Sequence, residues 1–142
     1  MTPADFALLR STVARDEGLR LHPYQDTEGK TSIGYGRNLT DNGISEAEAE
    51  AMLNRDLNTA VDELTQAFPF VLAFDGVRQV ALASMVYNLG LAGASKFVKM
   101  WAALRVADFD TAATEMLSSA WAQQVGARAT RLAEAVRSGE LK

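Results

Sequence analysis

Apolar residues recur along most of the chain at helical spacing, beginning with the N-terminal segment. Phe6, Leu9 and Val13 form an apolar stripe, which predicts a helix over residues 3–16 that buries this stripe. Glu17 occupies the next position of the stripe, at the helix end where the macrodipole disfavours a negative charge. Burial and the dipole would both favour the protonated acid. A surface glutamate at a frayed helix end fits the pattern equally well.

The spacing then changes to short alternating segments separated by glycines. Strands are predicted at residues 20–25 and 30–35, joined by the turn Asp26-Thr27-Glu28-Gly29, in a small antiparallel sheet over residues 20–40. A further turn is predicted at residues 40–43. Every later segment has helical spacing, so this sheet stands alone at the front of the chain.

The remainder of the chain predicts helices only. Ser45, followed three residues later by Glu48, is a capping-box pattern that starts a helix of about 23 residues, roughly 35 Å long. This helix is expected to connect an N-terminal lobe with a C-terminal lobe and to leave a cleft between them. The predicted helices are 45–67, 76–89, 94–105, 108–117, 118–124 and 126–136, with a short helical connector at 70–74 and breaks at Gly90 and Gly93.

Composition bounds the class of protein. The 142 residues, 48% hydrophobic and 23% charged, suit one compact globular domain with a real core. There is no cysteine, and the single histidine, His22, has no companion for a metal site. No apolar run is long enough to span a membrane, and the N-terminus lacks a signal-peptide pattern.

Charge is unevenly distributed along the chain. Residues 1–75 carry 6 basic and 13 acidic side chains, and residues 76–142 carry 8 basic and 5 acidic ones. The basic half would suit an anionic polymer such as peptidoglycan, although ordinary surface variation explains the asymmetry as well. The net charge of −4, without a dense Lys/Arg cluster, argues against nucleic-acid binding.

Residues 16–37, DEGLRLHPYQDTEGKTSIGYGR, hold three side chains of the types used in acid–base chemistry: Glu17, Asp26 and Ser32. From the residues alone, Asp26 fits a turn aspartate that binds its own backbone. Ser32 by itself indicates no function.

Taken together, the pattern E-G-L-R-L-x-x-Y-x-D-T-E-G-x-x-S-I-G-Y-G closely resembles the phage-type lysozymes of glycoside hydrolase family 24, and most of all the T-even phage lysozymes. In that family the Glu is the general acid, and the Asp with a hydroxyl residue holds the attacking water. The resemblance therefore implies these roles for Glu17, Asp26 and Ser32. The family usually has threonine at the last position, so Ser32 keeps the hydroxyl and loses a methyl group. The motifs M-V-Y-N-L-G and S-x-W-x-x-Q extend the resemblance over nearly the whole chain.

The resemblance implies an α+β, mainly α, lysozyme-like fold. A small N-terminal antiparallel β-sheet lobe, a long connecting helix and a helical C-terminal lobe would enclose a cleft between the lobes. We expect a single domain over residues 1–142, with residues 14–56 in the sheet lobe and residues 1–13 and 57–142 in the helical lobe.

Supporting residues also follow from the resemblance. Arg37 stands where the family has a histidine that pairs with an acid on the long helix, so an ion pair between Arg37 and Asp56 is predicted. Arg128 matches an arginine that contacts the catalytic glutamate, which would hold Glu17 in place while favouring its charged form.

The predicted substrate contacts are Glu28, Tyr87, Asn88, Trp121 and Gln124. Asn88 stands where the T-even enzymes have glutamine, so its reach is shorter. For Trp121 a place in the core fits as well as a sugar contact, and for Glu28 a solvated turn is the alternative.

The resemblance implies an endolysin-type muramidase that hydrolyses the β-1,4 bond between N-acetylmuramic acid and N-acetylglucosamine, with inversion and without metal or cofactor. Its partner would be peptidoglycan strands, with no nucleic acid and no membrane insertion, and we expect a monomer. It would stay in the host bacterial cytoplasm until a holin pore releases it to the wall. Two alternatives are a lysozyme-fold domain that binds peptidoglycan or a protein partner without cleavage, and a lytic transglycosylase. Asp26 argues against the transglycosylase, which needs no water-positioning acid.

Overall fold

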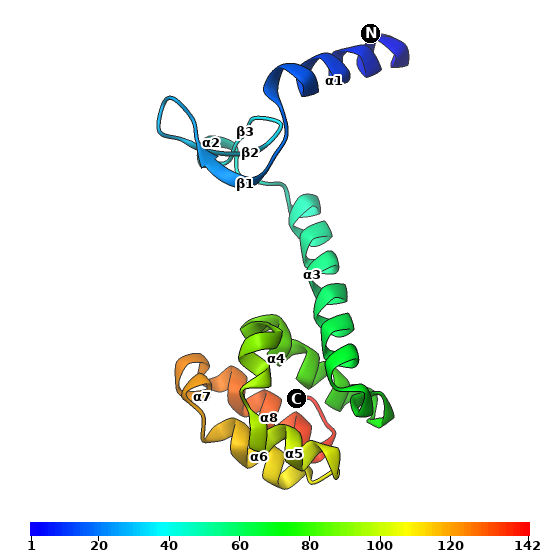
Figure 1. The fold of residues 1–142 in the computed structure, drawn as a ribbon, viewed down its shortest axis with the longest axis vertical. Helices are drawn as coiled ribbons and strands as arrows, with labels where there is room; N and C mark the ends of the chain where they lie inside the picture. Colours follow the sequence, from blue (N-terminus) through cyan, green and yellow to red (C-terminus); the bar gives the residue numbers. More distant parts are fainter. The chain divides into compact units, whose positions relative to one another are not determined.

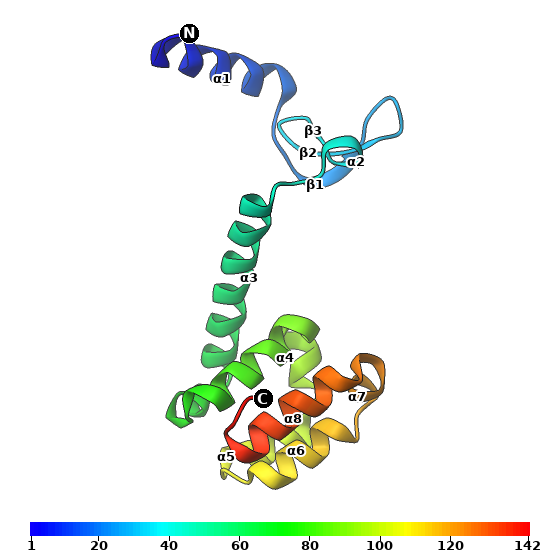
Figure 2. The same ribbon diagram turned by 180° about the vertical axis from the view of Figure 1, so that it is seen from behind.

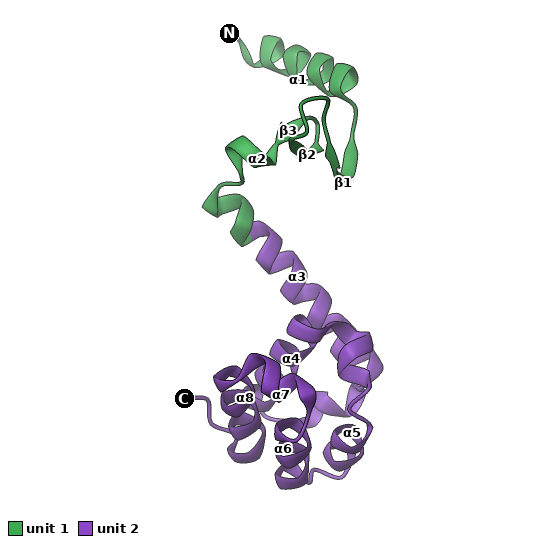
Figure 3. Cartoon of the chain, turned by 90° about the vertical axis from the view of Figure 1, so that its left-hand side faces the viewer, with its two compact units in different colours: residues 1–50 green, residues 51–142 purple.

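The computed structural model describes residues 1–142 and divides the chain into two compact units, residues 1–50 and residues 51–142 (Figure 3). The first unit contains a helix, a three-stranded sheet and a single helical turn, and the second contains helices only. The boundary falls near the start of the long helix α3 (Glu46–Ala67). The predicted α+β, mainly helical fold class is confirmed.

Helix α1 (Pro3–Glu17) begins at a reciprocal capping box. Thr2 Oγ1 accepts a hydrogen bond from Asp5 N at 3.1 Å, and the Asp5 carboxylate accepts one from Thr2 N at 3.0 Å. The helix ends at Gly18, whose φ of 72° is unfavourable for most other residues. The predicted helix is confirmed and is one residue longer.

Within the first unit, the apolar stripe of α1 is not buried. Phe6, Leu9 and Val13 are all exposed, and α1 contributes no buried residue. Tyr35 alone joins this helix face, around a hollow of about 270 Å³. A sheet of three short strands has too little apolar surface to cover a helix of four turns. That residues 1–13 pack with the C-terminal helices stays a prediction.

The sheet follows α1 directly. Strands β1 (Arg20–Gln25), β2 (Thr31–Gly34) and β3 (Arg37–Asn38) pair antiparallel in chain order (Figure 1). Tyr24 on β1 lies opposite Ser32 on β2, which in turn lies opposite Asn38 on β3. The predicted sheet within residues 20–40 is confirmed.

The predicted turn at residues 40–43 is largely a single helical turn, α2 (Leu39–Asn42). Asn38 caps this helix by accepting a hydrogen bond from Asp41 N at 3.0 Å, and Gly43 ends it. The residue types that favour turns also favour helix caps, so residues 40–43 fit a turn and the end of a short helix equally well. Asp41 also forms an ion pair with Lys30, which ties α2 to the β1–β2 turn.

The second unit is built from α3 beyond Glu50 and the helices that follow it (Figure 2). Within α3 only Ala60 and Leu64 are buried. The 3-10 helix η1 (Pro69–Ala73) occupies the predicted connector. The remaining helices are α4 (Gly76–Ser95), α5 (Val98–Arg105), α6 (Phe109–Leu117), α7 (Ala120–Val125) and α8 (Ala127–Ser138).

Helix α4 is longer than predicted. Only Gly90 leaves the helical conformation, with φ of 74° and ψ of 160°, and the chain turns there and returns to helix until Ser95. Gly93 does not break the helix, contrary to the prediction. Both are glycines that tolerate either conformation, so composition could not distinguish the two positions.

The hydrophobic core lies in the second unit. Met85 of α4 is fully buried and Leu104 of α5 is 1% exposed. Trp101 stacks on Phe68 with ring centroids 3.6 Å apart, and its Nε1 donates to Ala94 O at 2.8 Å. The predictions that Trp101 and Leu104 belong to the core are confirmed. The prediction that α4 lies at the centre of this unit is wrong, because α4 packs mainly against α8, whereas α6 and α8 each pack against three helices.

Arg78 joins the beginning of α4 to the end of α8. Its Nη1 donates to the Asp75 carboxylate at 2.8 Å, while Nε and Nη2 donate to the carbonyls of Val136 and Arg137 at 2.6 and 2.8 Å. Gly139 lies against the guanidinium: a Cβ added at this glycine would be only 3.1 Å from Arg78 Nη1. Arg78 thus satisfies carbonyls that a helix C-terminus leaves unpaired.

Candidate active site

Glu17, the predicted general acid, is the last residue of α1 and is exposed rather than partly buried as predicted. Its carboxylate lies against the backbone of Gly36 in the β2–β3 turn, where a Cβ would be 2.8 Å from Glu17 Oε2. The side chain therefore extends from the helix end onto the turn of the sheet. There the acid is open to solvent and to a ligand, which proton transfer to a substrate requires.

Asp26, the predicted water-holding acid, is the first residue after β1 and builds the β1–β2 turn. Its Oδ1 accepts hydrogen bonds from the backbone N of Glu28 at 2.9 Å and of Lys30 at 3.0 Å. Asp26 therefore has the turn role weighed from the sequence. Both bonds go to Oδ1, so Oδ2 keeps its capacity to accept a hydrogen bond from water.

Ser32 is 3% exposed and is the buried polar residue of this protein. Its hydroxyl makes no hydrogen bond to another protein group. Every fully enclosed side-chain nitrogen or oxygen of the protein has a hydrogen-bond partner. Because the Ser32 hydroxyl has none, it is not fully enclosed. A hydroxyl that is held in a strand and has no protein partner keeps its capacity to bind a water molecule.

The register of the sheet relates the position of Asp26 to that of Ser32. Tyr24 pairs directly with Ser32, so their side chains share one face, and Asp26 follows two residues after Tyr24. Glu28, a predicted substrate contact, is exposed in the turn beyond Asp26. Its side chain makes no hydrogen bond, as expected for the solvated turn that was the alternative.

Arg37 binds Glu48 and not the predicted Asp56. Its Nη1 lies 2.6 and 2.5 Å from the two carboxylate oxygens. Glu48 also completes the predicted capping box of α3, accepting from Ser45 N at 3.0 Å and donating its own N–H to Ser45 Oγ at 3.1 Å. The box fixes Glu48 at the start of α3, while Asp56 lies about two turns further along the helix.

The partners of Glu48 change its acidity. The hydrogen bond from the Arg37 guanidinium, followed by those from Ser45, lowers the pKa of Glu48 from its ordinary value of 4.5 to about 2. A hydrogen bond to the ionised form favours that form. The pair therefore holds the β3 end of the sheet to the start of α3 at any pH well above 2.

In the second unit, two predicted substrate contacts bind each other. Trp121 Nε1 donates to Asn88 Oδ1 at 2.7 Å, which joins α7 to α4. Trp121 is 4% exposed and packs edge-on against Phe97, with ring centroids 6.1 Å apart. Trp121 thus has the core position weighed from the sequence. Asn88 is exposed, and its amide nitrogen remains free to donate.

A groove of about 430 Å³ between α3 and α4 gathers three predicted residues, Asp56, Tyr87 and Asn88. Thr59 and Glu63 also line it and were not identified from the sequence. Their positions three and seven residues after Asp56 put them on one face of α3, a signal that was present in the spacing. Carboxylates, a hydroxyl and an amide give this groove the donors and acceptors that a hydroxyl-rich ligand needs.

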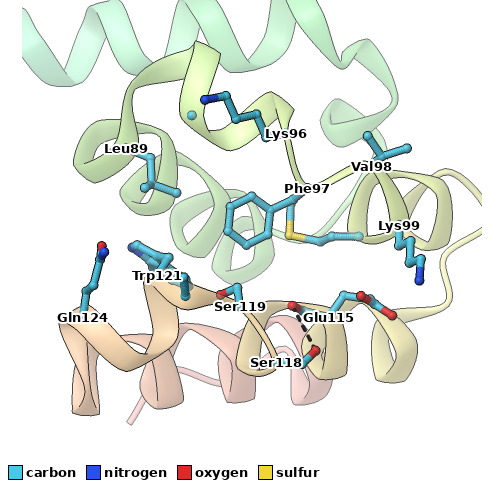
Figure 4. Close-up of a pocket in the computed structure, with 13 residues that line it drawn as sticks. Leu89, Lys96, Phe97, Val98, Lys99, Glu115, Ser118, Ser119, Trp121 and Gln124 are labelled. Atoms are coloured by element: carbon cyan, nitrogen blue, oxygen red, sulfur yellow. Dashed lines mark hydrogen bonds between the residues drawn. The ribbon is translucent and has the colours of Figure 1, made fainter.

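A second cavity, of about 610 Å³, is lined by residues of α4 to α7 and of their connections (Figure 4). The rings of Phe97 and Trp121 form its wall, with Gln124 beside Trp121 at one end and Lys99 and Glu115 at the other (Figure 4). Of the predicted contacts, Gln124 and Trp121 belong to this cavity.

The predicted residues thus fall into two groups. The catalytic three lie in the first unit, and every predicted substrate contact except Glu28 lies in the second. Arg128 is half-buried near the start of α8, and its predicted contact with Glu17 stays a prediction. No three His, Cys, Asp or Glu side chains are grouped to hold a metal ion. None of the helices combines the length and the apolar character of a membrane span.

Known proteins resemble this chain over most of its length. Residues 14–137 match the family model described as phage lysozyme. The chain is 27% identical to probable T4-type lysozyme 2 of Dictyostelium discoideum, over 94% of this chain and 96% of that protein. It is 31% identical to the pre-baseplate central spike protein Gp5 of Enterobacteria phage T4, over 90% of this chain but 27% of that protein. An endolysin of Acyrthosiphon pisum secondary endosymbiont phage 1 is 30% identical, over 82% and 80%.

Proposed function

The chain belongs to the phage lysozyme family, and on that premise we propose that it is an endolysin-type muramidase. It hydrolyses the β-1,4 bond between N-acetylmuramic acid and N-acetylglucosamine in peptidoglycan and serves host-cell lysis. Family membership and relatives named lysozyme and endolysin support a lytic hydrolase of the muramidase type. The choice of bond, the stereochemistry and the lytic role are our proposal.

The observation that carries the proposal is that the first unit contains an exposed acid and, apart from it, a carboxylate and a hydroxyl with free oxygens. Glu17 is an exposed acid at the end of α1, while Asp26 lies just beyond β1 and Ser32 lies on the neighbouring strand β2. Asp26 and Ser32 each keep an oxygen with no protein partner. The unit therefore offers one group to donate a proton and two groups to hold a water molecule.

In the reaction, Glu17 donates its proton to the glycosidic oxygen as the bond to the anomeric carbon breaks. A water molecule held by Asp26 Oδ2 and the Ser32 hydroxyl attacks that carbon from the opposite face and loses its proton to Asp26. One displacement of this kind inverts the anomeric centre. Inverting enzymes hold their two carboxyl groups roughly 6.5–9.5 Å apart, which leaves space for the water.

The proposal extends to the substrate contacts, the oligomeric state and the location of the enzyme. The exposed Tyr87 ring and the free amide of Asn88 contact the glycan strand, and no metal or organic cofactor takes part. The enzyme acts as a monomer. It accumulates in the bacterial cytoplasm and reaches the wall through a pore made by a separate holin.

The proposal is tested by release of reducing sugar ends from purified peptidoglycan. Wild type should be active, and Glu17→Gln should lose at least about 100-fold in kcat, because general acid catalysis contributes that much or more. Glu50→Gln is the matched control, an exposed glutamate of the same unit with no predicted role, and should lose far less. A folded but inactive wild type that sediments with peptidoglycan would contradict the enzyme and favour a binding domain.

The products distinguish hydrolysis from transglycosylation and inversion from retention. Mass spectrometry should show fragments that gained water, and a 1,6-anhydro end would instead indicate a lytic transglycosylase. Proton NMR of the first products from soluble glycan fragments should show the α-anomer at the new reducing end. The β-anomer formed first would contradict the single displacement and the role of Asp26 as base.

A further inference from the structure

We propose that Gly36 is a positioning residue for the general acid, an inference that rests on the proposed function. The three atoms nearest to a Cβ built at Gly36 all belong to Glu17: Oε2 at 2.8 Å, Cδ at 3.2 Å and Cγ at 3.6 Å. The first distance is shorter than van der Waals contact between carbon and oxygen. The carboxylate therefore occupies the space that any side chain at position 36 would take.

The backbone conformation of Gly36 does not account for this contact. Gly34, the last residue of β2 just before this turn, has a φ of 70° and Gly36 has a φ of 78°, so both lie in the region that favours glycine. A Cβ at Gly34 would meet nothing within 4 Å. Both glycines allow the turn, and Gly36 alone also makes room for Glu17.

The absence of a side chain at Gly36 leaves space for the acid. Glu17 is exposed at the end of a helix, so its side chain has several rotamers available. A side chain at position 36 would exclude the rotamer that places the carboxylate beside the turn. The next residue, Arg37, is held by Glu48, which fixes the turn that contains Gly36. Misplacement of a catalytic group by about 1 Å can cost as much as 100-fold in rate, so access to this position matters for catalysis.

The test compares Gly36→Ala with Gly34→Ala. Both place alanine at a positive φ and should lower the melting temperature by similar amounts. Only Gly36→Ala should lower kcat on soluble glycan fragments, by about 10- to 100-fold with little change in KM, since it displaces the acid and not the substrate. Equal kcat values for the two variants, measured well below both melting temperatures, would overturn the proposal.

A second measurement needs no variant and no activity. In wild type, a nuclear Overhauser effect should connect the Gly36 Hα protons with the Glu17 Hγ protons, because Glu17 Cγ lies 3.6 Å from the position that a Cβ would take at Gly36, on the side of one Hα. Its absence would overturn the proposal even if Gly36→Ala failed to fold. A wild type that shows this effect but releases no reducing ends would refute the proposed function and leave the contact itself established.

Discussion

Each of the two units of this protein is stabilised internally by a different kind of interaction. The second unit contains the whole buried hydrophobic cluster, whereas Ser32 is the buried residue of the first unit. The first unit depends on turn hydrogen bonds, helix caps and the ion pairs of Lys30 with Asp41 and Arg37 with Glu48. The predicted acid–base residues all lie in this unit. Because it has no hydrophobic core, its carboxylates stay close to water.

This contrast implies that stability and activity respond to different residues. Substitutions in the core of the second unit should mainly change the free energy of unfolding. Substitutions among the polar groups of the first unit should mainly change catalysis, since no cavity is created and water can replace lost contacts. The following predictions test that separation, from the largest effect to the smallest.

Leu104→Ala should be the most damaging to stability. The side chain is 1% exposed, and its removal leaves a cavity in close-packed surroundings, which costs about 2–5 kcal/mol. Leu21→Ala on β1 is the matched control, because Leu21 is 74% exposed and should cost less than about 0.5 kcal/mol. Urea unfolding measures both. Equal losses would show that the first unit has a core after all.

Ser32→Ala should have the opposite effect from Leu104→Ala, lowering activity while leaving stability nearly unchanged. We expect a loss of about 100-fold in kcat, at the lower end of acid–base contributions, with little change in the free energy of unfolding, because the hydroxyl has no protein partner. Ser32→Thr restores a hydroxyl and should recover most of the activity. An active Ser32→Ala enzyme would remove Ser32 from the mechanism.

Asn88→Ala tests a polar contact of the second unit. The substitution leaves Trp121 Nε1 without its acceptor in a side chain that is 4% exposed, which costs about 1–2 kcal/mol. Gln124→Ala, at an exposed position whose side chain makes no hydrogen bond, is the control and should be nearly neutral. If both variants are equally stable, water replaces Asn88 at no cost.

Arg37→Met should have the smallest effect, visible as a change in pH dependence. The folded-state pKa of Glu48 is lowered from 4.5 to about 2, so its contribution to stability is present above pH 4.5 and is lost as the pH falls toward 2. In the variant, a carboxyl NMR titration should show the pKa of Glu48 rising toward 4.5, and the melting temperature should fall less between pH 6 and pH 2.5.

A control for this prediction is Arg15→Met. Arg15 contacts Asp16 at 3.4 Å, and both side chains are largely exposed. Its removal should leave the titration of Glu48 unchanged. A Glu48 pKa that stays near 2 in Arg37→Met would show that the capping box alone lowers it.

Features with local causes could be predicted from the sequence. Thr2 and Asp5 cap α1, Ser45 and Glu48 cap α3, and Asp26 forms its turn through bonds that span at most four residues. These elements depend on neighbours along the chain. The pattern of residues therefore contains most of the information needed to find them.

Features that depend on contacts distant in sequence could not be predicted. Arg37 was predicted to pair with Asp56, whereas the capping box of α3 places Glu48 beside it. The bond between Asn88 and Trp121 joins residues 33 apart. Gly36 was recognisable as a turn glycine, but its contact with Glu17 depends on where α1 ends relative to the sheet. The acid–base residues themselves came from the family resemblance of the whole motif.

The bonds from Arg78 to the end of α8 bear on how the chain can be engineered. Deleting the segment from Val136 onward would remove both acceptor carbonyls and Gly139, leaving a guanidinium that is 17% exposed without those partners. Joining another module after Lys142 disturbs none of these groups, because Lys142 is exposed. Chimeric lysins built from this chain should therefore place the junction beyond Gly139.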